Sequence, residues 1–193
     1  MPITTPSFRS QLLELMSQVF QRAFDDWKAM FGFEANVERV GMRVLRSTEE
    51  LLEVIVGEGC IVRTILQGRA TGPLLYAFPI DFLGQAVASA LMIPNPADLE
   101  GNWEEEEQQD ALHELMNLFC GSSTHAIEEL EYRLRVSQSL DHLKVEISPE
   151  NLAGDLPLDV SLCCFDVTVS TSLGEAKMWL LMPEDVALAF ETK

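Results

Sequence analysis

The feature that most constrains the fold is an internal repetition, in which two segments of the first half recur in the same order roughly 100 residues later. Residues 11–20 align with 111–119 and share Glu-Leu-Met, and residues 75–82 align with 180–186 and share a Pro two positions before an Asp. Chance similarity of apolar patterns is the alternative. Because the shared residues go beyond apolar pattern, we favour a duplicated unit.

The pattern of apolar residues predicts the same element order in both halves. The first half reads as a helix at 8–32, a strand at 36–46, a strand pair at 59–67 and 72–78, and a helix from 79. After a Pro-rich connection, the second half reads as a helix at 103–131, two strands within 133–148, a strand pair at 158–171 and 175–182, and a helix from 183.

A unit of helix, strands and helix cannot bury its sheet alone, so two such units must share a core. We therefore expect an α+β fold in which a duplicated helix–strands–helix unit forms one core, with a mainly antiparallel sheet packed against long helices. The chain 1–193 is then a single domain of two tandem repeats, at about 8–92 and 103–192.

The helix expected at 103–131 separates two kinds of residue. At about 100° per residue, Asp110, Glu114, Asn117 and Gly121 fall on one narrow stripe. The opposite side is apolar and must face a core: Leu112, Leu115, Met116 and Phe119. The stripe thus presents two carboxylates, a carboxamide and a residue without a side chain.

Such a stripe is also what any solvent-facing side of an amphipathic helix would show. Two observations favour a functional site. The turn 120–124 consists of small residues that would let another surface come close, and the first repeat carries Ser10, Ser17 and Gln21 at three of the four positions. A serine hydroxyl lacks the paired donor and acceptor of a carboxamide, so only the second repeat has the full set.

Composition excludes several classes of function. A net charge of −18, from 31 acidic and 13 basic residues, disfavours nucleic acid and anionic membranes as partners. The Glu104–Glu107 run suits the start of a helix better than a metal site. Four cysteines without C-x-x-C spacing, and no signal-peptide or membrane-spanning pattern, predict a reduced cytoplasmic protein. The histidines lack metal-ligand spacing, so we expect no metal and no cofactor.

On these residues the chain resembles the CheC/CheX/FliY phosphatases of bacterial chemotaxis. Their signature is Asp or Ser, three residues, Glu, two residues and Asn, which Asp110, Glu114 and Asn117 match, and Gly121 matches a Gly usual four residues later. The stretch at 72–79 is also similar to the family. The Pro expected about 22 residues after the Asn is absent, since position 140 is Leu and the nearest Pro is Pro149.

The resemblance implies hydrolysis of the aspartyl phosphate of a CheY-like response-regulator receiver, with the Mg²⁺ held by the receiver. Asn117 would position the attacking water and Glu114 would pair with a receiver Lys, while Asp110 and Gly121 would contact the partner. The alternative is a non-catalytic module that binds a receiver, a chemotaxis deamidase or a flagellar switch protein. The sequence leaves open which receiver is used, the role of Asp110, and whether the protein is a monomer or a homodimer.

Overall fold

The computed structural model describes residues 5–55, 58–68, 70–99, 105–129, 134–138, 144–146, 156 and 160–191. The elements of the first half are α1 (Pro6–Phe31), β1 (Ala35–Leu45), α2 (Thr48–Val54), β2 (Glu58–Gly68), β3 (Gly72–Pro79), α3 (Ile80–Ala90) and η1 (Pro96–Asp98). Those of the second half are α4 (Glu106–Glu129), β4 (Leu134–Gln138), β5 (Lys144–Glu146), β6 (Leu162–Thr171), β7 (Gly174–Pro183), α6 (Glu184–Ala187) and η3 (Leu188–Phe190).

The strands form one antiparallel sheet in the order β1-β6-β7-β3-β2-β4, with β5 paired to β2. This order is symmetric about the β7–β3 pair. Strand β1 of the first half pairs with β6 of the second, and β4 of the second half pairs with β2 of the first. Each half therefore completes the sheet of the other, and the expected α+β fold with a duplicated unit sharing one core is confirmed. The repeat boundaries at 8–92 and 103–192 stay a prediction.

The helices divide between the two faces of the sheet. The main core lies under α1, α3 and α4, and alternate residues of β6 point into it: Cys163, Phe165, Val167 and Val169. A smaller core covers the other face and includes Leu51 of α2 with Cys164 and Leu181 of the sheet. Among the described helices, none is both long and apolar enough to cross a membrane.

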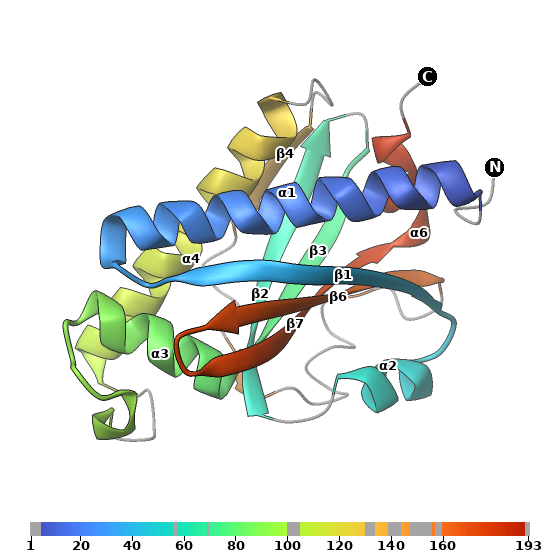
Figure 1. Ribbon diagram of the computed structural model, residues 1–193. Helices are drawn as coiled ribbons and strands as arrows, with labels where there is room; N and C mark the ends of the chain where they lie inside the picture. The colour runs from blue at the N-terminus through green and yellow to red at the C-terminus, as the bar shows by residue number, and fades with distance from the viewer. Residues whose placement is uncertain are drawn as a thin grey trace.

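Local signals place the helix ends near the predicted positions. Gly32 follows α1 in the left-handed conformation (φ 72°) and its N–H donates to the Lys28 carbonyl, as expected of a glycine that ends a helix. Pro79 and Pro183 stand directly before α3 and α6. The ends of α1 and α3 lie beside the first turns of α4, at the left of Figure 1.

Candidate functional site

Helix α4 is fixed in the molecule through its apolar side. Leu115 and Met116 are fully buried, and the ring of Phe119 lies among five aromatic neighbours with centroid distances of 5.1–6.0 Å. Those neighbours are Phe20, Phe24, Trp27, Tyr76 and Phe78. Aromatic pairs of this kind contribute about 0.5–1.5 kcal/mol each beyond area burial. The helix backbone is thereby held in one position relative to the sheet.

Two polar contacts from α1 add to this packing. The indole Nε1 of Trp27 donates to the Leu115 carbonyl oxygen at 2.8 Å inside the core. The Ser122 hydroxyl lies 2.6 Å from a carboxylate oxygen of Asp26. A buried hydrogen bond of the first kind is costly to break, because the carbonyl and the indole would both lose their partner. Both contacts fix α4 on α1 close to the stripe.

All four stripe residues lie on the exposed side of this fixed helix. Asp110, Glu114, Asn117 and Gly121 are each exposed, one turn apart along α4. Glu114 and Asn117 are three residues apart, about 4.5 Å along the helix axis. A carboxylate and a carboxamide can therefore reach the same partner surface. No described element covers either of them.

The prediction for the small-residue turn after Asn117 was wrong in part. Cys120, Ser122 and Ser123 are buried, and only Gly121 of these faces outward. These three small side chains therefore pack inside the molecule, and the Ser123 hydroxyl donates to the Phe119 carbonyl one turn earlier in α4. Burial also raises the pKa of the Cys120 thiol to about 12, so it is not a nucleophile at neutral pH.

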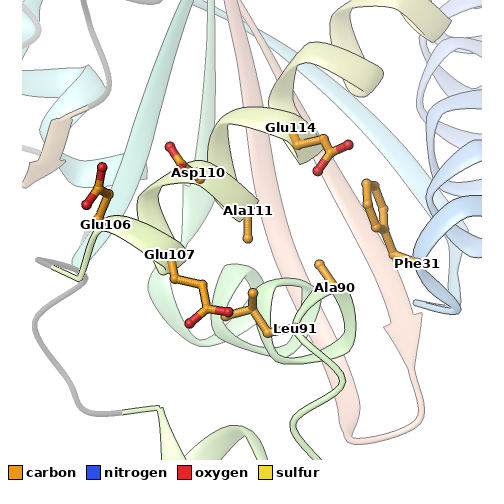
Figure 2. Close-up of a pocket in the computed structure, with 8 residues that line it drawn as sticks. All are labelled: Phe31, Ala90, Leu91, Glu106, Glu107, Asp110, Ala111 and Glu114. Atoms are coloured by element: carbon orange, nitrogen blue, oxygen red, sulfur yellow. The ribbon is translucent and has the colours of Figure 1, made fainter.

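An open groove of about 490 Å³ adjoins the stripe at the start of α4. We call it the groove; it is lined by Phe31, Ala90, Leu91, Glu106, Glu107, Asp110, Ala111 and Glu114. In Figure 2 the carboxylates of Glu107 and Glu114 extend toward α3 and the end of α1, while those of Glu106 and Asp110 lie on the other side of α4. The groove was not predictable from the sequence, because its lining joins residues of α1, α3 and α4 that are distant along the chain.

Of the other residues considered from the sequence, some lie on α4 without being part of the stripe, and others fall outside the described residues. His125 Nε2 lies 2.9 Å from Glu129 Oε1, one turn later in α4. Within the described ranges, no group of three or more His, Cys, Asp or Glu side chains could hold a metal ion. Glu104, Leu140, His142 and Pro149 lie outside those ranges. Glu106 and Glu107 lie in the first turn of α4, where the positive end of the helix dipole stabilises acidic side chains.

No protein-family model and no curated protein matches the sequence. Solved structures do match. A crystal structure of FliY from Thermotoga maritima superposes with a TM-score of 0.74 at 15% identity, covering 96% of this chain and 94% of the chain in that structure. A chain of the FliG–FliM complex from H. pylori gives 0.76 at 7% identity, covering 97% and 100%. A CheC-like superfamily protein from Shewanella sp. PV-4 gives 0.52 at 13% identity, covering 88% and 97%.

Identities this low bear on the fold and not on the chemistry. The fold that they show is the one that the resemblance to the CheC/CheX/FliY proteins implied. The chain therefore has the fold shared by the FliY structure, the matched chain of the FliG–FliM complex and the CheC-like structure.

Proposed function

We propose that this chain hydrolyses the aspartyl phosphate of a CheY-like response-regulator receiver in chemotaxis signalling. The observation that carries the proposal is the exposure of Glu114 and Asn117, side by side, on a helix whose other side is held in the core. Phosphoryl transfer depends on positioning and on charge neutralisation more than on covalent help. A rigid helix that presents an orienting group to a partner meets the first need.

The roles follow from the chemistry of the side chains. The Asn117 carboxamide offers one acceptor and two donors, so it can hold a water and align it with the phosphorus atom. Glu114 would pair with a receiver Lys and set the register of the two proteins, with Asp110 and Gly121 as further contacts. The receiver supplies the phosphorylated Asp and its Mg²⁺. This chain needs no nucleophile of its own.

The test is release of phosphate from phosphorylated CheY-like receivers in the presence of the chain. Asn117→Ala should reduce the acceleration roughly 10²–10³-fold, the usual effect of losing one orienting or stabilising group. Ser17→Ala, at the equivalent position of α1, is the matched control and should leave it unchanged. Full activity in Asn117→Ala would remove that residue from the mechanism.

A second candidate function is a binding module without turnover. It is favoured by the match to a chain of the FliG–FliM complex, a structure whose name records a protein–protein assembly. By this proposal the same α4 face binds a receiver, a deamidase or a flagellar protein. Saturable binding of a phosphorylated receiver without faster phosphate loss would select this candidate over the phosphatase.

A further inference from the structure

The groove beside the stripe has two features that point to a ligand of particular chemistry. Its floor is apolar, formed by side chains from the ends of α1 and α3 and from α4: Phe31, Ala90, Leu91 and Ala111. Every charged residue that lines it is acidic (Glu106, Glu107, Asp110 and Glu114), and the carboxylates of Glu107 and Glu114 are the two that extend toward α3 and the end of α1. An apolar surface bordered by charge of one sign fits an apolar side chain flanked by the opposite charge.

The charge argues against a second copy of this chain as the occupant. With 31 acidic and 13 basic residues, another copy would bring mostly carboxylates toward a border of carboxylates. Like charges placed opposite one another across an interface cost free energy. A basic segment of another protein would not meet this repulsion, because its charge is opposite to that of the border.

We propose that the groove docks a basic amphipathic helix of a partner protein, with an apolar side chain on the floor and Lys or Arg beside Glu107 and Glu114. Helix-in-groove recognition uses apolar anchors on one helix face in this way. The inference extends the partner surface beyond the stripe and holds whether or not Asn117 is catalytic.

Two strongly exposed methionines stand next in sequence to residues that line the groove. Met92, just after α3, is 89% exposed, and Met30, in the last turn of α1, is 65% exposed. Each is adjacent in sequence to a residue of the floor, Leu91 and Phe31 respectively. Flexible, polarisable methionine side chains are common on surfaces that adapt to a partner helix.

The probe for the test is a fluorescently labelled, helix-forming peptide of Leu and Lys, with a Leu/Glu peptide of the same apolar pattern as its control. Binding is followed by anisotropy at about 0.15 M salt, where distant charges are screened. We expect saturable binding of the Leu/Lys peptide alone. Ala90→Phe, which fills the floor without changing charge, should weaken it at least tenfold, with folding checked by thermal unfolding.

The matched pair of charge variants is Glu107→Lys and Glu14→Lys. Both positions are exposed on helices and both variants change net charge equally, but Glu14 lies 17 residues before Phe31 on α1, about 25 Å along the axis. Glu107→Lys should weaken binding more than Glu14→Lys, by up to roughly fivefold, the upper end of what one exposed ion pair contributes. Because Glu107 is exposed, this comparison remains informative even if Ala90→Phe does not fold.

Three results would overturn the proposal. The first is no saturable binding of the Leu/Lys peptide. The second is equal weakening by the two Lys variants, which would assign the binding to total charge. The third is a dimer in sedimentation that Ala90→Phe separates, which would assign the groove to a second copy. Phosphate release by Asn117→Ala, measured separately, distinguishes failure here from failure of the proposed function.

Discussion

Substitution of Gly121 separates what the fold requires from what a partner requires. A Cβ added at this position would meet no neighbouring atom within 4 Å, and the residue lies inside α4. Glycine within a helix costs about 0.5–1 kcal/mol relative to alanine. Gly121→Ala should therefore raise the free energy of unfolding by that amount. For a chain of 193 residues, this corresponds to a rise in Tm of roughly 1–4 °C.

The expected effect on function has the opposite sign. Gly121 lies one turn beyond Asn117 on the same stripe, so a side chain there would stand between the carboxamide and an approaching partner. Gly121→Gln copies the residue at the equivalent position of the first repeat, Gln21. We expect it to slow phosphate release from the receiver at least about tenfold, which corresponds to an activation free energy about 1.4 kcal/mol higher or more. The smaller side chain of Gly121→Ala should have a lesser effect.

The assay pairs thermal unfolding with phosphate release for the wild type and both variants. A lower Tm in Gly121→Ala would show that the outward position assigned to this residue is wrong. Wild-type phosphate release by Gly121→Gln would show that no partner approaches the backbone closely at this point. Either result would refute the reasoning, and the two results are independent of each other.

Two further predictions concern stability. Met92 adopts the left-handed conformation (φ 57°) at the end of α3, where glycine is usual, so Met92→Gly should raise the free energy of unfolding by about 1 kcal/mol in chemical denaturation; a decrease would contradict this. Burial raises the pKa of all four thiols from near 9 to about 12 (Cys60, Cys120, Cys163 and Cys164). Between these pH values the unfolded chain binds fewer protons than the folded chain, so stability should fall with rising pH, by at most about 1.4 kcal/mol per thiol and pH unit. The denaturation midpoint measured from about pH 8 to 11 checks this, and Cys→Ser at a single buried site should reduce the slope.

The sequence predicted the structure well wherever the spacing of apolar residues within a single helix or strand determines which side is buried. The positions of α1, α4 and the two hairpins followed from apolar spacing and from glycine or proline at the ends. The outward stripe on α4 followed from the same spacing, because an apolar side of a helix must face the core. These are local consequences of burial, which is why a single sequence carries them.

The pairing of strands between the halves was not predictable in the same way. A period of two says which side chains share a face, but it does not say that β1 pairs with β6 or that β4 pairs with β2. The groove was missed for a related reason, since its lining joins residues 31, 90–91 and 106–114. The small residues of α4 were assigned outward because the sequence cannot distinguish a close internal contact from a close external one.

The two repeats share their inward packing and differ in how their outward stripe is used. At the position of Gly121, helix α1 has Gln21, whose Oε1 accepts from the Val37 N–H at 2.9 Å and whose Nε2 donates to Asp25 at 2.9 Å. This side chain holds the edge strand β1 against the helix. Replacing it would leave a backbone N–H of that strand without its partner, at a cost of about 1 kcal/mol or more. Because α1 needs the Gln21 side chain for this contact, it cannot have a glycine at that position. Only α4 can combine a glycine, Gly121, with a carboxamide one turn away, Asn117.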